Sequence, residues 1–250
     1  MKAALITGGA RRIGAAIARA LAEDGWHVCI HHNRSGDDAR AVLDSIRAAG
    51  GDGRLVRADL ADPDAARVVL AQCADVTLSC LVNNASLFDY DDLGAMTVES
   101  FDRHMAVNLR APALLAQGFA AQAPERGGCI VNLVDNKVFS LNPDYLSYSL
   151  SKVGLAGLTE MLAMGLSPRV RVAAIAPGIT LSSDRMTAEE YDRLHALNPL
   201  GRGCSVDEIV LAVRFILATP SFNGRAIVID GGQSLLGLDR DVAFIQGGRA

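Results

Sequence analysis

Residues 7–14 have the sequence TGGARRIG and lie between an apolar run, Ala3–Thr7, and a helical pattern, Ile13–Asp24. Small residues let a backbone turn tightly and approach a ligand closely. The first turn of a helix offers unpaired N–H groups and a positive dipole to a pyrophosphate. A glycine-rich string alone is weak evidence, but its position between a strand and a helix predicts a dinucleotide-binding turn.

Short apolar or β-branched runs alternate with longer helical patterns along the chain. Strands are expected at Ala3–Thr7, His27–Asn33, Arg54–Ala58, Leu78–Asn83, Cys129–Val134, Val170–Ala176 and Ala226–Ile229. Helices are expected at Ile13–Asp24, Asp37–Ala49, Asp62–Gln72, Val98–Gln122, Leu146–Leu166 and Ser205–Leu217. This alternation predicts an α/β fold: one doubly wound parallel sheet of about seven strands, with helices on both faces. We expect a single domain over residues 1–250 and a short helix over a cleft within residues 181–200.

Composition excludes several classes of protein. The chain has 250 residues, half of them hydrophobic, and a net charge of −4, so it lacks the basic excess that nucleic-acid binding needs. Its five cysteines are scattered without a CxxC pair, which indicates reduced thiols and no metal site. Charges interrupt every apolar run before it reaches membrane-spanning length. We therefore expect a soluble cytoplasmic protein that binds neither nucleic acid nor membranes.

Two arginines indicate which dinucleotide binds. Arg12 stands in the glycine-rich turn, where a cation opposes the helix dipole, so a ligand contact is favoured over a solvated surface role. About 20 residues further on, an NAD site would carry Asp or Glu for the ribose 2′-hydroxyl. Residues 31–35 instead have the sequence HHNRS, in which Arg34 and Ser35 suit a 2′-phosphate. The sequence predicts NADPH rather than NADH, and Asp37 and Asp38 are expected to cap the second helix.

Tyr148 and Lys152 lie four residues apart in a predicted helix. This spacing places both side chains on one helix face. A nearby ammonium stabilises the phenolate and lowers the tyrosine pKa, so the hydroxyl can exchange a proton near neutral pH. The pair occurs by chance in many helices, but the upstream glycine-rich turn makes a reaction centre the better interpretation.

Taken together, these residues resemble the short-chain dehydrogenases/reductases over nearly the whole chain. The matching motifs are the Thr7–Gly14 turn, Asp59, Asn83-Asn84-Ala85, Asn108, Tyr148 with Lys152, Pro177-Gly178 and Asp230-Gly231-Gly232. The resemblance implies a Rossmann-type subunit, usually in a homotetramer, with hydride transfer at the carboxyl edge of the sheet. It also implies that Asn108 supports a proton-relay water. Together with the two phosphate-binding segments, it assigns to the cofactor Gly8, Arg12, Ile13, Asn33, Arg34, Ser35, Asp59, Leu60, Asn84, Ala85, Ser86, Tyr148, Lys152, Pro177 and Gly178.

Three departures from the family pattern resemble the pteridine reductases and the related bacterial enzymes that reduce dihydromonapterin or dihydrofolate. Asp135 replaces the usual active-site serine, Ser86 with Leu87-Phe88 replaces the usual glycine, and Arg12 lies in the turn. This resemblance implies a pterin or folate substrate that Phe88 sandwiches against the nicotinamide. Arg12 and Ser86 would hold the pterin and a cofactor phosphate, and Asp135, Tyr148 and Lys152 would deliver the proton.

The chemistry of a carboxylate supports this role for Asp135. A carboxylate beside Tyr148 disfavours the phenolate, opposes Lys152 and keeps the phenol protonated. Reduction of a C=N bond needs such a proton donor once hydride has added to carbon. The simpler interpretation is that Asp135 only caps a strand end.

The favoured function is thus NADPH-dependent reduction of a pterin or dihydropterin. Two alternatives stay open: a carbonyl reductase acting on a 3-oxoacyl group or a sugar ketone, and a regulator that senses NADP without chemistry. The missing serine counts against the first alternative, and the retained Tyr148 and Lys152 count against the second. The side chain of the pterin and the role of residues 181–200 stay open as well.

Overall fold

Seven parallel strands form one sheet in the order β3-β2-β1-β4-β5-β6-β7. The computed structural model describes residues 2–125, 127–182 and 187–245. The strands are β1 Ala3–Ile6, β2 His27–His32, β3 Asp52–Arg57, β4 Leu78–Asn83, β5 Gly128–Leu133, β6 Val170–Pro177 and β7 Ala226–Ile229. The predicted doubly wound α/β fold is therefore confirmed, and β3 begins two residues before its predicted start.

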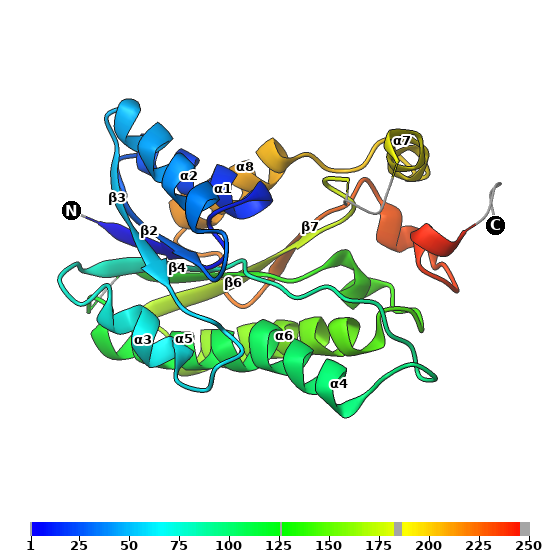
Figure 1. Ribbon diagram of the computed structural model, residues 1–250, viewed down its shortest axis with the longest axis horizontal. Coiled ribbons are helices and arrows are strands. Elements are labelled where there is room, and N and C mark those ends of the chain that lie inside the picture. Colours follow the sequence, from blue (N-terminus) through cyan, green and yellow to red (C-terminus); the bar gives the residue numbers. More distant parts are fainter. Residues whose placement is uncertain (1, 126, 183–186, 246–250) are drawn as a thin grey trace.

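Helices cover both faces of the sheet (Figure 1). One face carries α1 Arg12–Glu23, α2 Gly36–Ala48 and α8 Val206–Ala218, and the other carries α3 Ala65–Ala71, α4 Val98–Met105, α5 Ala111–Gln122 and α6 Leu146–Gly165. The inner strands β1 and β4 are buried along their whole length because helices pack against both sides. None of the helices in the described part of the chain has the length and hydrophobicity that a membrane crossing requires.

The predicted helix Val98–Gln122 is not one regular α-helix. A π-helical turn, Ala106–Arg110, separates α4 from α5. Pro112 has no N–H to donate to the carbonyl of Asn108, the bond that an α-helix would form there. Such π-helical insertions often lie at functional sites, and this one contains Asn108.

Two other helix predictions need correction. The helix expected from Asp62 starts only at Ala65, because residues 59–64 form turns closed by side chains of Asp59 and Asp62. Asp37 and Asp38 do not cap α2: they lie in its first turn, after the N-cap Ser35. The Asp38 carboxylate accepts a hydrogen bond from the Arg11 guanidinium at 2.6 Å instead.

The less regular segment after β6 contains α7, Ala188–Ala196. Thr187 and Glu190 form a capping box at its N-terminus, which explains why this polar stretch is helical. Part of the segment, residues 183–186, lies outside the described residues. Figure 1 shows α7 and the C-terminal segment at the same end of the molecule, beyond the carboxyl ends of the strands.

Candidate active site

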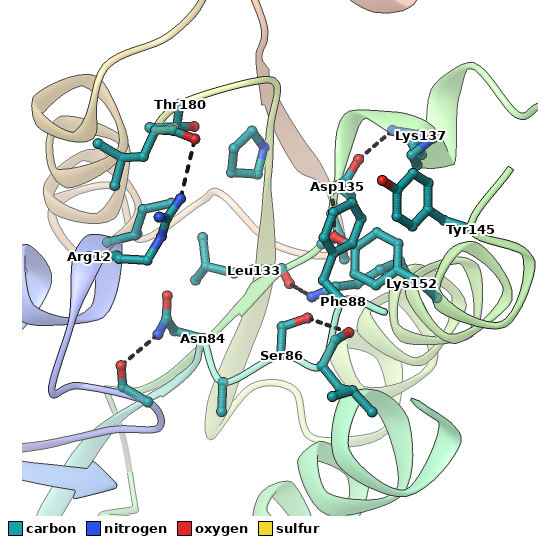
Figure 2. A pocket seen from close by; sticks show the side chains of 18 of the residues that line it. Arg12, Asn84, Ser86, Phe88, Leu133, Asp135, Lys137, Tyr145, Lys152 and Thr180 are labelled. Atoms are coloured by element: carbon teal, nitrogen blue, oxygen red, sulfur yellow. Dashed lines mark hydrogen bonds between the residues drawn. The ribbon is translucent and has the colours of Figure 1, made fainter. Parts of the chain in front are cut away.

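A cleft of about 1170 Å³ follows the carboxyl edge of the sheet. It lies where the strand order reverses between β1 and β4, which is the usual ligand crevice of an open parallel sheet. Every predicted site residue except Asn108 lines this cleft. Figure 2 shows Arg12 and Asn84 on one side and Phe88, Asp135 and Tyr145 on the other.

The turn after β1 is closed by glycine geometry and by Asn84. Gly8 has φ +63°, and a Cβ on Gly14 would come within 2.2 Å of the Gly8 carbonyl oxygen. Asn84 Nδ2 donates to the carbonyl oxygens of Thr7 at 2.9 Å and Gly8 at 3.2 Å, while Thr7 Oγ1 accepts the N–H of Asn84 at 2.9 Å. Asn84 therefore joins the ends of β1 and β4 and holds the start of α1 beside the cleft.

Arg12 has partners within the protein. Its backbone has φ +52°, and its guanidinium donates to the carbonyl oxygens of Ser182 at 2.8 Å and Leu181 at 3.3 Å. It thus connects the glycine-rich turn to the segment after β6, across the cleft (Figure 2). A guanidinium has five N–H donors, so these bonds leave further donors for a ligand.

The residues after β2 form a cationic end of the cleft. Asn33, Arg34 and Ser35 line it, and residues 31–35 contain no carboxylate. Arg34 forms no ion pair with any described residue, whereas Arg11, which also lines the cleft, is paired with Asp38. An exposed arginine without a carboxylate partner matches a phosphate monoester.

His31 supports the glycine-rich turn in a way that sequence reasoning missed. Its Nδ1 accepts the N–H of Gly8 at 3.2 Å, so Nε2 is the protonated nitrogen and donates to the Ala58 carbonyl oxygen at 3.2 Å. Burial lowers the pKa of His31 to about 4. The ring is therefore neutral at physiological pH and bridges β2, β3 and the turn.

Asp135 and Tyr148 are in direct contact at the other end of the cleft. The Tyr148 hydroxyl donates to Asp135 Oδ2 at 2.6 Å, and Asp135 Oδ1 accepts the N–H of Lys137 at 2.9 Å. Asp135 thus caps the short helical turn that follows β5 and also contacts the tyrosine. Burial, the Asp135 charge and this hydrogen bond together raise the pKa of Tyr148 well above its ordinary value. The phenol is protonated at neutral pH, as the sequence argument predicts.

Lys152 lies behind Tyr148 on the same face of α6. It is 3% exposed, and its Nζ donates to the Leu133 carbonyl oxygen at 2.7 Å. Burial lowers the pKa of Lys152 to about 8, although the nearby Asp135 charge acts in the opposite direction. The site therefore holds a protonated phenol between a carboxylate and a lysine that loses its charge slightly above neutral pH.

Phe88 is half exposed in the cleft, and one face of its ring is covered by Tyr145. The two rings stack with centroids 4.3 Å apart and an interplanar angle of 12°, while Phe88 meets Tyr148 edge-on at 4.6 Å. Sequence reasoning missed Tyr145, although its position three residues before Tyr148 could have suggested that it lies near the site. The stack holds Phe88 as a flat apolar surface beside the Tyr148 ring.

The C-terminal segment forms a further wall of the cleft that the sequence did not predict. Arg240 and Asp241 line the cleft. The buried Asp144 carboxylate accepts two bonds from the Arg240 guanidinium, at 2.7 and 2.8 Å, and one from the Asp241 N–H at 2.7 Å. The Asp241 carboxylate pairs with the buried Lys137. These ion pairs connect residues about 100 positions apart, so no local pattern reveals them.

Asn108 is buried behind the cleft, and its side-chain amide forms three hydrogen bonds. Its Oδ1 accepts the Leu87 N–H at 2.8 Å, and its Nδ2 donates to the Leu87 carbonyl oxygen at 2.9 Å and to Ser151 Oγ at 3.0 Å. The amide therefore holds the backbone beside Phe88.

Comparison with known proteins agrees with this architecture. The model of the short chain dehydrogenase family matches residues 2–193. An uncharacterized oxidoreductase of Methylorubrum extorquens is 33% identical over 92% of this chain and 97% of its own. The 3-oxoacyl-[acyl-carrier-protein] reductase FabG of Staphylococcus aureus is 31% identical over 92% and 97%.

A solved structure is more similar. FolM alternative dihydrofolate reductase 1 of Brucella suis, in complex with NADP, superimposes with a TM-score of 0.90 at 43% identity, covering 93% of this chain and 95% of its own. Fold, family match and the cleft at the sheet edge agree on one conclusion. This chain belongs to the short-chain dehydrogenase family and is an oxidoreductase that uses a nicotinamide dinucleotide.

Proposed function

We propose that the enzyme uses NADPH to reduce a C=N bond of a pterin or dihydropterin, with Tyr148 as the proton donor. The 2.6 Å hydrogen bond from Tyr148 to Asp135 carries this proposal. In carbonyl reductases of this family a serine holds the substrate oxygen at this position, whereas a carboxylate can accept hydrogen bonds from the amino group and ring N–H of a pterin. The similarity to FolM alternative dihydrofolate reductases supports the same substrate class.

The residues of the cleft fit this cofactor. Arg34 and Ser35 would hold the 2′-phosphate, the turn from Gly8 to Ile13 the pyrophosphate, and Asp59 with Leu60 the adenine. Asn84, Ala85, Ser86, Pro177 and Gly178 would line the nicotinamide half, and Lys152 would bind its ribose. When bound, the cofactor supplies a hydride to the substrate carbon.

The chain supplies the proton and the orientation. Phe88 would stack on the pterin ring, with Tyr145 supporting its far face. Asp135 would accept hydrogen bonds from the pterin, and Arg12 and Ser86 would contact its edge. Tyr148 would transfer its hydroxyl proton to the ring nitrogen as the C=N bond becomes a C–N single bond, and solvent would return a proton to the phenolate afterwards.

Loss of NADPH absorbance tests the proposal with dihydrobiopterin, dihydrofolate, a 3-oxoacyl thioester and a simple ketone compared side by side. We expect turnover of the pterins to exceed that of the carbonyl compounds. Faster reduction of the 3-oxoacyl thioester would assign the enzyme to carbonyl reduction. Tight NADPH binding without turnover of any substrate would favour a sensor.

Arg34→Ala is expected to weaken NADPH binding by about 10-fold to 100-fold, because the 2′-phosphate would lose its contact with the guanidinium. NADH lacks this phosphate, so its Kd should stay within about twofold. Fluorescence titration with both cofactors measures the two constants. Arg40→Ala is the matched control, since Arg40 is exposed on α2 and does not line the cleft. Equal weakening of both cofactors would contradict the assignment.

Phe88→Ala is expected to raise the KM for dihydropterin by about 10-fold or more, because the stacking surface is lost. The KM for NADPH should change much less. Phe244→Ala is a suitable control: Phe244 contacts Tyr90 and Tyr145 in the same aromatic cluster but does not line the cleft. Similar increases in both KM values would show that Phe88 is only a packing residue.

A further inference from the structure

The loop that carries Phe88 is held by a row of polar side chains on the neighbouring helical segment. Ser100, His104 and Asn108 follow one another at four-residue spacing, so they lie along one side of the helix. Asn108 binds the backbone of Leu87, His104 Nε2 accepts the Asp89 N–H at 3.2 Å, and Ser100 Oγ donates to Asp91 Oδ2 at 2.9 Å. His104 and Asn108 are completely buried. The loop from Leu87 to Asp91 is therefore fixed at three points.

Asp91 also contacts the start of α6, 56 residues further along the chain. Its Oδ1 accepts the Ser147 N–H at 2.9 Å, and its backbone carbonyl accepts the Leu146 N–H at 3.0 Å. The first N–H groups of a helix have no partner within the helix. The N-cap residue, Tyr145, has left-handed backbone angles and makes no side-chain cap hydrogen bond. Asp91 thus provides the cap that α6 lacks locally.

The charge of Asp91 suits this position. Burial alone would raise the pKa of Asp91, but hydrogen bonds from Ser147 and Ser100 outweigh that effect and hold the pKa below its ordinary value. The carboxylate is thus ionised at neutral pH, and a negative charge at a helix N-terminus interacts favourably with the helix dipole. Asp91 is 1% exposed, so solvent competes little for these bonds.

We propose that Asp91 is a positioning residue that fixes Phe88 and Tyr148 relative to each other. One side chain joins the loop of Phe88 to the helix turn that presents Tyr148, and the two rings meet edge-on at an interplanar angle of 80°. Asp91 does not line the cleft. It acts through the two residues that would contact the pterin, so its role rests on the function proposed above.

The test compares Asp91→Ala with Asp91→Asn in the NADPH-bound enzyme. Asp91→Ala should lower kcat/KM for dihydropterin by about 10-fold to 100-fold, mainly in kcat, because small displacements of reacting groups are costly. Asp91→Asn keeps an oxygen that can accept the Ser147 N–H, so activity should recover to within about threefold of wild type. The Kd for NADPH should stay within about twofold in both variants, since the cofactor end of the cleft is built from other elements.

Asp92→Ala is the matched control. The Asp92 carboxylate accepts hydrogen bonds from the Tyr90 hydroxyl and from the Gly94 and Ala95 N–H groups, so its hydrogen-bond partners in the described part of the chain lie within its own loop and not in α6. Activity within about threefold of wild type is expected. Hydrogen exchange supplies a readout that does not depend on turnover: the Leu146 and Ser147 amides should exchange faster in Asp91→Ala, while amides in the middle of α6 should not change.

The outcomes separate the two proposals. Wild-type kcat/KM in Asp91→Ala, or an equal loss in Asp92→Ala, would overturn the positioning role. If Asp91→Ala does not fold, a loss in Asp91→Asn as large as 10-fold would contradict the cap, because that variant retains the acceptor. If the wild-type enzyme does not reduce pterins, the proposed function fails, and hydrogen exchange at Leu146 and Ser147 still decides whether Asp91 caps α6.

Discussion

Tyr148→Phe is expected to lower kcat for dihydropterin reduction by about 10²-fold to 10⁴-fold, the usual contribution of a positioned proton donor. The variant loses the hydroxyl that donates to Asp135 at 2.6 Å but keeps the ring that contacts Phe88. The Kd for NADPH should therefore change little. Steady-state NADPH oxidation and fluorescence titration measure the two effects separately.

Tyr145→Phe is the control for this prediction. Tyr145 is the neighbouring tyrosine that stacks on Phe88, and the phenylalanine ring preserves that contact. We expect its kcat to stay within about threefold of wild type, because the proposed proton comes from Tyr148. Comparable losses in the two variants would mean that the aromatic cluster, rather than the Tyr148 hydroxyl, limits the reaction.

Asp135→Ser is expected to lower kcat/KM for dihydropterin by about 10-fold to 100-fold, because the pterin loses a charged hydrogen-bond acceptor. The substitution also removes the charge that helps to raise the pKa of Tyr148. The tyrosine pKa should then fall, so the phenol loses its proton at a lower pH. The basic limb of the pH profile for reduction should move to lower pH, which kcat/KM measured across the pH range would show.

Asp135→Asn separates the charge from the shape of the side chain. The amide oxygen can still accept the Lys137 N–H that Asp135 Oδ1 accepts at 2.9 Å. We expect the same shift of the basic limb as in Asp135→Ser, because both variants are neutral. Unchanged pterin turnover in Asp135→Ser would leave the residue with its capping role alone and would reopen carbonyl reduction as the function.

Local sequence patterns predicted most helices and strands of the fold. The main errors concern the middle of one predicted helix and the N-cap of α2. The strands were predictable because a strand buried on both faces is a short apolar run, whatever its neighbours are. The predicted helix Val98–Gln122 was wrong in its middle, because Pro112 has no N–H for the α-helical hydrogen bond to the carbonyl of Asn108, and a π-helical turn forms there instead. The prediction that Asp37 and Asp38 cap α2 was wrong because the helix begins at Gly36, which makes Ser35 the N-cap residue.

The sequence by itself determined the glycine-rich turn after β1 and the pairing of Tyr148 with Lys152 on one helix face, because both depend on backbone geometry over a few residues. Only the tertiary structure decided that Tyr145 supports Phe88, that Asp144 holds Arg240 beside the cleft, and that Asp91 caps α6. Each of these contacts joins segments that are not adjacent in the chain or depends on a particular rotamer. Such contacts form because folding brings the ends of the parallel strands to one edge of the sheet. The periodicity of the sequence predicts each helix and strand but not the contacts between segments that are distant in the chain.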